Sequence, residues 1–158
     1  MLLKEINEME VRRAKAGEGR LLSEIALRSK AYWGYDRDFV EACREALTIS
    51  ESTIASEFVY VLEEESDIIG FFCFDVNGDK SELDDLFIVP EFIGKGYGRL
   101  LWNSILEKAK ELGISEFTID SDPYAEGFYK KMGAIRIGEI ASTVFKDRKL
   151  PLMKVVVV

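Results

Sequence analysis

One stretch of the sequence decides the fold: Leu86-Phe87-Ile88-Val89-Pro90-Glu91-Phe92-Ile93-Gly94-Lys95-Gly96-Tyr97-Gly98-Arg99-Leu100-Leu101. An apolar run ends at Pro90, three glycines follow within five residues, and an amphipathic segment begins directly after them. The pattern predicts a strand, a glycine loop and a helix. Glycine lets successive backbone amides point the same way, and the helix dipole adds to their positive potential. We therefore expect this loop to bind a phosphate group.

Two common phosphate-binding motifs do not fit the loop. A P-loop requires Gly-Lys followed by Ser or Thr, and neither residue occurs between Gly94 and Arg99. A dinucleotide fingerprint that starts at Gly94 requires a glycine where Arg99 stands. A nucleotide-binding protein is therefore disfavoured, and a tight turn without a ligand remains the plainer alternative.

Composition excludes several other classes of protein. The 158 residues carry a formal net charge of −8, which is opposite to that of a nucleic-acid-binding module. There is no histidine, so a Ser-His-Asp triad, a Cys-His pair and a histidine-ligated metal are excluded, and no metal is expected. Cys43 and Cys73 lack CxxC spacing and are expected to be buried thiols in a reducing compartment. Met1–Glu5 offers no apolar core for a signal peptide and no run could span a bilayer, so a cytoplasmic protein is expected.

The remaining elements extend outward from the glycine loop. Towards the N-terminus, hydrophobic spacing predicts a helix over 17–30, a second from an Asp36 cap to Leu47, and strands over 58–62, 68–76 and 82–89. Towards the C-terminus it predicts a helix ending at Gly113, a strand over 117–120, a helix over 125–132 and two final strands. No linker interrupts the chain, so residues 1–158 are expected to form one α/β or α+β domain on a single mixed sheet.

The glycine loop resembles the acetyl-CoA signature of the GCN5-related N-acetyltransferases (GNAT), in which Gln/Arg-x-x-Gly-x-Gly/Ala opens a helix after a strand and a proline. Ile93 stands where the family usually has Gln or Arg. A second motif follows at the expected distance: Asp122–Ala134 is similar to the family's Asn-x-x-Ala-x-x-Phe-Tyr-x-x-x-Gly-Phe, with Asp122 for Asn and Ala134 for Phe. The resemblance implies a mostly antiparallel sheet, flanked by helices and splayed between its fourth and fifth strands.

By this resemblance the chain is expected to transfer an acetyl group from acetyl-CoA directly to the amine of a small molecule or peptide. The residues implied in binding acetyl-CoA are Leu86, Phe87, Ile88, Ile93, Gly94, Lys95, Gly96, Tyr97, Gly98, Arg99, Asp122 and Tyr129. Tyr129 occupies the position where the family commonly keeps a tyrosine that donates to the departing thiolate. The alternative role for Tyr129 is that of a packed core aromatic.

Glu82 and Asp84 are the candidate general bases for the amine. Strand alternation predicts that they share one face of their strand, with Asp85 on the other. Asp120 and Asp122 lie across the predicted splay and could relay a proton through water, although Asp122 also suits a helix cap. For each acid, a solvated or structurally paired carboxylate is an equally good interpretation.

The acceptor pocket is expected between the first two helices, at Tyr32, Trp33 and Tyr35, where aromatic rings and Asp36 could hold a cation. Simple packing of these rings under the helices is the alternative. The final Val155–Val158 predicts a buried strand, or an edge able to pair in a dimer, so the protein is expected to be a monomer or homodimer. A non-catalytic acyl-CoA-binding or sensing domain is the alternative function.

Overall fold

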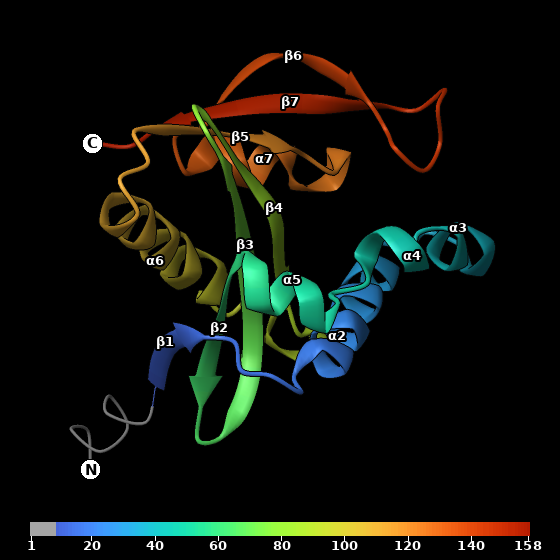
Figure 1. Ribbon diagram of the computed structural model, residues 1–158. Coiled ribbons are helices and arrows are strands. Elements are labelled where there is room, and N and C mark those ends of the chain that lie inside the picture. The colour runs from blue at the N-terminus through green and yellow to red at the C-terminus, as the bar shows by residue number, and fades with distance from the viewer. Residues whose placement is uncertain (1–8) are drawn as a thin grey trace.

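The computed structural model describes residues 9–158, so the expectations for Met1–Glu5 and for the full 1–158 domain extend beyond the described residues. Figure 1 shows the elements in order, and their bounds are β1 (Met9–Arg13), α2 (Gly19–Tyr32), α3 (Arg37–Ala42), α4 (Arg44–Leu47), α5 (Glu51–Ser56), β2 (Phe58–Glu64), β3 (Asp67–Asn77), β4 (Lys80–Ile88), η1 (Pro90–Phe92), α6 (Tyr97–Glu111), β5 (Glu116–Asp120), η2 (Pro123–Ala125), α7 (Glu126–Lys131), β6 (Ile135–Ala141) and β7 (Lys149–Val156). Within the described residues, no helix has the length and apolar character needed to cross a membrane.

The strands form one seven-stranded sheet in the order β1-β2-β3-β4-β5-β7-β6. Every neighbouring pair is antiparallel except β4 and β5, which run parallel. These two strands are joined at a single register position, Glu82 opposite Thr118, whereas β3 and β4 pair along most of their length. The sheet therefore opens into a wedge between its fourth and fifth strands, and the predicted mixed, splayed sheet is confirmed.

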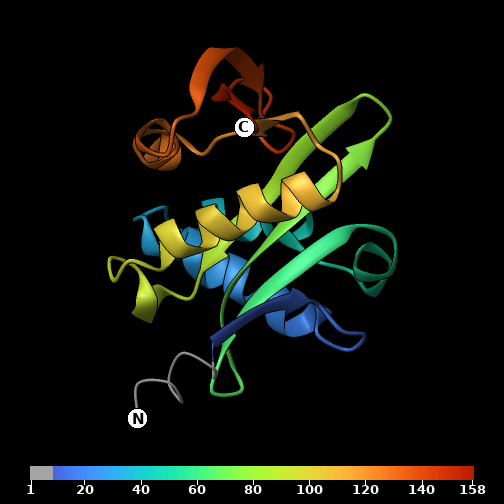
Figure 2. The ribbon, with the colours of Figure 1, turned by 90° about the vertical axis from the view of Figure 1, so that its left-hand side faces the viewer.

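Helices cover both faces of the sheet. On one face, α6 and α7 pack on a core that contains Phe72, Phe74, Leu101, Ile105 and Met153. On the other face, α2 and α5 cover a second core of buried residues: Leu22, Ile25, Ala26, Ile49, Ile54, Val59, Val61, Phe71, Cys73 and Val89. Figure 2 shows α6 crossing in front of the sheet while α2 lies behind it. Burial of these side chains from both sides is the main stabilising contribution to the fold.

Three local features differ from the sequence prediction. The sequence pattern did not predict β1 or the six-residue α5, which begins where Ser50 accepts a hydrogen bond from the Thr53 amide at 3.0 Å. The predicted helix after Asp36 is divided at Cys43, whose amide bonds to the carbonyls of both Phe39 and Val40. Asp36 does cap α3, accepting from the Phe39 amide at 2.8 Å.

The cysteines and the final strand follow the sequence prediction in part. Cys43 and Cys73 are free and buried, as expected. Val155 is buried in β7, but Val156 and Val158 are exposed. Since β7 lies between β5 and β6, the C-terminal valines do not form a sheet edge, and β6 is the edge strand instead.

Candidate active site

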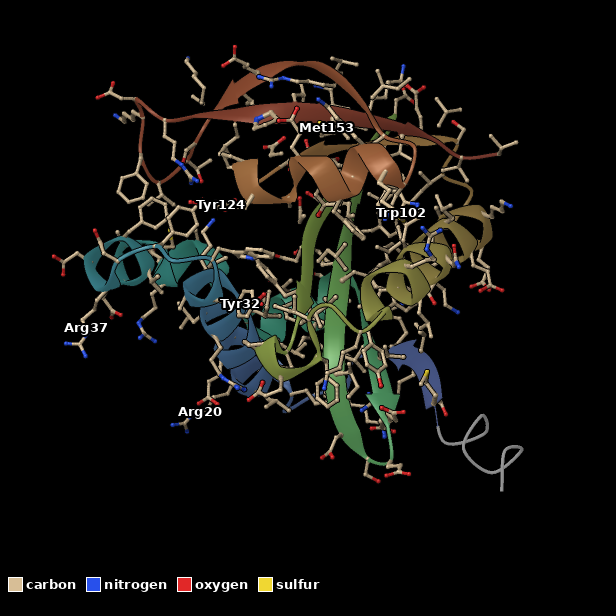
Figure 3. All side chains as sticks on the ribbon, turned by 180° about the vertical axis from the view of Figure 1, so that it is seen from behind. Arg20, Tyr32, Arg37, Trp102, Tyr124 and Met153 are labelled. Atoms are coloured by element: carbon tan, nitrogen blue, oxygen red, sulfur yellow. The ribbon has the colours of Figure 1, made fainter. Side chains whose placement is uncertain are left out.

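A cavity of about 660 Å³ occupies the wedge between the two parts of the sheet. Its walls come from the end of α2, α4, the second half of β4, the glycine loop, the end of β5, α7 and the loop after β6. Both sequence motifs therefore face one space. Figure 3 shows Tyr124, which lines this cavity, between helices α2 to α4 and strands β6 and β7.

The glycine loop forms one wall of the cavity, where Ile93, Gly94, Gly96, Gly98 and Arg99 all line it. Gly94 and Gly96 have φ of +81° and +91°, a backbone conformation that disfavours any side chain. Gly98 is required for a different reason, since a Cβ there would lie 3.1 Å from the Phe128 ring. The backbone of the loop can therefore approach a ligand closely, because the glycines place no side chain between them.

The amides of this loop are available to a ligand. Those of residues 94–99 make no hydrogen bond of normal length and angle to any acceptor in residues 9–158. Their position before and within the first turn of α6 adds the helix dipole. The loop therefore fits the pyrophosphate of acetyl-CoA, and Leu86, Phe87 and Ile88 continue the cavity wall along β4.

Two predicted side chains of the loop point elsewhere. Tyr97 donates its hydroxyl to Glu64 at 2.9 Å and packs edge-on against Phe92, and it does not line the cavity. The Lys95 ammonium lies 5.9 Å from the centre of the Phe92 ring and is likewise outside the lining. Any contribution of these two residues to ligand binding comes through their backbone.

A β-bulge in β4 changes which acids share a face. Cys73 is opposite Asp85 and Phe74 is opposite Leu83, so Asp84 is an extra residue between the two pairs. Because Cys73 and Asp75 share a face and Glu82 is opposite Asp75, Glu82 and Asp85 lie on the same face. The expectation from strict alternation, with Asp85 opposite to Glu82 and Asp84, is wrong because alternation breaks at the bulge.

Asp84 and Asp85, at the bulge, line the cavity, whereas Glu82 stands at the single β4–β5 pair and does not line it. Burial, followed by the charge of Glu57, raises the pKa of Asp85 to about 7. Partial burial, followed by the charges of Asp85 and Asp75, raises the pKa of Asp84 to about 8. Asp85 is the more enclosed of the two. Asp120, which lines the cavity from β5, also has its pKa raised by burial.

Tyr129 lies on α7 and lines the cavity although the residue is only 7% exposed. Its ring packs against Trp102 and Phe128, with centroid distances of 5.9 and 5.5 Å. The hydroxyl makes no side-chain hydrogen bond within residues 9–158. Burial and then the charges of Asp85 and Asp122 raise the Tyr129 pKa above its usual range, so the hydroxyl stays protonated as a donor.

Asp122 joins the two sides of the cavity. It pairs with Lys30 of α2, accepts from the Tyr35 hydroxyl at 3.0 Å, and accepts from the Tyr124 amide at 2.8 Å as the cap of η2. Burial alone would raise the Asp122 pKa. The hydrogen bond and charge of Lys30, with the bonds from Tyr124 and Tyr35, outweigh burial and hold the pKa below its usual value.

The predicted acceptor aromatics have separate positions. Trp33 lines the cavity and stacks on Tyr124 at 6.0 Å. Tyr35 lies behind the lining, stacked on Phe39 at 4.2 Å, and Tyr32 is 51% exposed and outside it. Two cations of the protein, Lys30 and Arg148, already lie over the rings of Tyr35 and Phe39. Sequence reasoning missed Lys30 and Arg148, which no local pattern marks, and Tyr124, which occupies a variable position of the second motif.

Residues 17–144 match the acetyltransferase (GNAT) domain family. The chain belongs to the GNAT family. This match covers the glycine loop, the acids of β4, Tyr129 and most of the cavity wall. It confirms the family resemblance that the two sequence motifs carry.

Relatives and solved structures agree with this family. The chain is 26% identical over 91 residues to an uncharacterized N-acetyltransferase, ycf52, from Pyropia yezoensis, which covers 57% of this chain and 52% of the relative. The chain therefore matches about half the length of this curated relative. PaiA N-acetyltransferase from Thermoplasma acidophilum, in complex with coenzyme A, superposes with a TM-score of 0.77 at 21% identity, covering 94% of this chain and 98% of that one. Spermidine N-acetyltransferase from Vibrio cholerae, in complex with CoA and spermine, superposes with a TM-score of 0.70 at 20% identity, and the superposition covers 96% of each chain.

One group of side chains in this GNAT domain has the spacing of a metal site. Ligand atoms of Glu57, Cys73 and Asp84 lie within 4.8 Å of one another. Metals bind the thiolate form of cysteine, and burial, followed by the charge of Asp85, raises the Cys73 pKa far above its usual value. This chemistry disfavours a metal there, and the absence of a metal stays a prediction.

Proposed function

We propose that this GNAT domain transfers the acetyl group of acetyl-CoA to the amine of a small molecule or peptide. One observation carries the proposal: the glycine loop, whose amides at residues 94–99 have no partner within residues 9–158, the acids of the β4 bulge and Tyr129 all contribute to the wall of one cavity. Acetyl-CoA supplies an activated thioester when bound. The protein's own residues then have three tasks, which are to hold the phosphates, to accept the amine proton and to donate to the sulfur.

The glycine loop takes the first task. Each backbone amide donates a charge-assisted hydrogen bond to phosphate, worth roughly 1.5–3 kcal/mol, so three or four such bonds would anchor a pyrophosphate. Arg99 and Lys131, both lining the cavity, add positive charge. Ile93 contributes an apolar surface where family members usually have a polar side chain, so binding depends on backbone rather than on that residue.

Asp85 takes the second task, with Asp84 beside it. An alkyl amine with a pKa of ~10.4 is mostly protonated at neutral pH, and deprotonating it costs ~4.6 kcal/mol at pH 7. Deprotonating an α-amine with a pKa of ~7.8 costs only about 1 kcal/mol at pH 7. A base works best when its pKa is near the working pH, and the carboxyls of Asp85 and Asp84, with pKa raised to about 7 and about 8, meet that condition.

Tyr129 takes the third task. A thiolate leaving group, whose thiol has a pKa of ~8.5, is stabilised by a nearby hydroxyl donor. The Tyr129 hydroxyl is protonated and has no side-chain partner among residues 9–158, so it is free to donate when a sulfur lies beside it. No cysteine nucleophile is needed, which agrees with direct attack by the amine on the thioester.

The test combines binding with turnover. Acetyl-CoA affinity is measured by calorimetry, and thiol release is followed with a panel of amino acids, polyamines, aminoglycosides and N-terminal peptides. We expect binding and acceptor-dependent thiol release. Binding without release for any acceptor would favour the alternative of a non-catalytic acyl-CoA-binding or sensing domain. Absence of acetyl-CoA binding would refute both.

A further inference from the structure

Two cations line the cavity near the aromatic residues, in addition to those beside the glycine loop. Lys30 comes from α2 and Arg148 from the segment just before β7. The single acid that either one contacts within the described residues is Asp122, which pairs with Lys30 and lies 3.8 Å from Arg148. Asp122 is ionised because its pKa is held low. These three side chains therefore carry one net positive charge on the cavity wall.

Arg148 is held in a fixed orientation. Its guanidinium lies 4.9 Å from the centre of the Phe39 ring and 5.2 Å from that of Tyr35. Its Nη2 donates to the Tyr35 hydroxyl at 2.5 Å, and that hydroxyl in turn donates to Asp122. The ring contacts and this bond orient the guanidinium without using most of its donors.

The rest of the guanidinium is free. The Nε and Nη1 groups of Arg148 donate no hydrogen bond to any residue from 9 to 158. A planar guanidinium with an unused edge binds a carboxylate through two parallel hydrogen bonds, and Lys30 adds a second positive charge. Elsewhere on the wall, the carboxyl groups of Asp84, Asp85 and Asp120 can accept hydrogen bonds from the amine.

We infer that the acceptor is an amino acid: a small molecule that carries a carboxylate, bound by Arg148, as well as the amine that is acetylated. This inference rests on the proposed function and names its acceptor class. It differs from the expectation that the aromatic rings and Asp36 hold a cation of the acceptor, because the protein's own cations already lie over the rings of Tyr35 and Phe39.

The experiment compares acceptors that differ only in the carboxylate. Lysine is compared with cadaverine, which is the same diamine without the carboxylate, and phenylalanine with its carboxamide. For each pair, kcat/KM is measured by thiol release at saturating acetyl-CoA. We expect a ratio of about tenfold or more in favour of the carboxylate in the wild-type protein, carried mainly by KM. Arg148→Gln should lower that ratio by about tenfold.

Controls separate this effect from general damage. Arg136→Gln removes a guanidinium that pairs with Glu126 outside the cavity, and it should leave the ratio within about twofold. Arg148→Lys keeps the charge without the planar edge and should give an intermediate ratio, which also serves if Arg148→Gln fails to fold. A wild-type ratio at or below one, or an unchanged ratio in a folded Arg148→Gln variant, would overturn the inference.

The inference can be tested even without turnover. Trp33 lines the cavity, so its fluorescence reports acceptor binding. Tighter binding of lysine than of cadaverine, lost in Arg148→Gln, would support a carboxylate site even if no acetyl transfer occurs. Equal binding of both would overturn it. Failure of acetyl-CoA to bind would refute the proposed function. The comparison of lysine with cadaverine would then still show whether Arg148 binds a carboxylate.

Discussion

Lys30 and Asp122 form an ion pair although 92 residues separate them in the sequence. Lys30 belongs to α2, which covers the first half of the sheet, and Asp122 follows β5, the first strand of the second half. Their side chains are only 13% and 20% exposed. Since β4 and β5 are joined at one register position, this pair connects the two halves on the open side of the wedge, together with the bond between Arg148 and Tyr35.

Removing the Asp122 charge should destabilise the protein. Asp122→Asn leaves Lys30 buried without its partner, and we expect the free energy of unfolding at pH 7 to fall by about 1–3 kcal/mol. The stabilisation is present above the unfolded pKa of ~3.9 and is lost as pH falls through the lower folded pKa. Urea unfolding at pH 7 and pH 3 measures both effects. Asp79→Asn, in an exposed turn, is the matched control, and an equal loss in the two variants would contradict the prediction.

A side chain at Gly96 should block the glycine loop. Gly96→Glu places a Cβ and a negative charge where the amides face the ligand, so acetyl-CoA affinity should fall at least about 100-fold. Gly17→Glu is the control, because Gly17 has a similar φ of +94° and free space around it but lies outside the cavity. Both variants pay a similar backbone strain. Calorimetry on folded proteins should show near wild-type affinity for the control alone, and equal affinities in both would refute the site.

Ionisation of the Asp85 carboxyl should lower the free energy of unfolding as pH rises. Its pKa is raised to about 7, so the folded protein binds this proton more tightly than the unfolded chain does. The free energy of unfolding therefore falls from about pH 4 to about pH 7 and remains low above it. Asp85→Asn should increase it by roughly 1–3 kcal/mol at pH 8 and by little at pH 4. Denaturant titrations at both values provide the measurement, and a variant less stable than wild type at pH 8 would contradict it.

The same acids should shape the pH dependence of catalysis. If Asp85 or Asp84 accepts the amine proton, kcat/KM should rise as pH increases through about 7 to 8. Asp85→Asn and Asp84→Asn should lose activity most at neutral pH and recover towards pH 9, where the amine is less protonated. Glu82→Gln should keep the wild-type profile, because Glu82 does not line the cavity. If Glu82→Gln alone flattens the profile, the base is Glu82 after all.

Loss of the Tyr129 hydroxyl should slow the chemical step. Tyr129→Phe keeps the ring contacts with Trp102 and Phe128, so folding and acetyl-CoA affinity should stay within a few-fold of wild type. We expect kcat to fall by roughly 10²–10⁴. Tyr97→Phe removes a hydroxyl that bonds to Glu64 outside the cavity and should keep kcat. Equal kcat in wild type and Tyr129→Phe, with chemistry shown to limit the rate, would make Tyr129 a packed aromatic.

Local patterns explain what the sequence could predict. The apolar run, the glycines and the amphipathic segment that follow one another from Leu86 to Leu101 specify β4, the loop and α6 without reference to the rest of the chain. The same holds for the Asp36 cap of α3. β1 was missed because Met9–Arg13 contains only two apolar residues in five, and its strand conformation depends on pairing with β2.

Long-range contacts explain what the sequence could not predict. The bulge in β4 depends on the register with β3, so strand alternation placed Asp85 on the wrong face. Arg148 reaches Tyr35 across 113 residues, and nothing in the sequence around either residue indicates that bond. The net charge of the whole chain, −8, does not describe this part of the cavity wall, where Lys30, Asp122 and Arg148 together carry a positive charge.

The bulge also determines which faces the side chains of β4 occupy. Leu86 and Ile88 pack towards α6 and Phe87 towards α2 because the extra residue shifts the alternation by one position. Deleting Asp84 would remove the bulge and leave a regular strand in which Leu83 and Leu86 still face α6. Such a deletion should therefore remove one carboxyl group from the cavity and leave both cores in place. The bulge thus adds an acidic side chain to the strand without changing the pairing of the residues on either side of it.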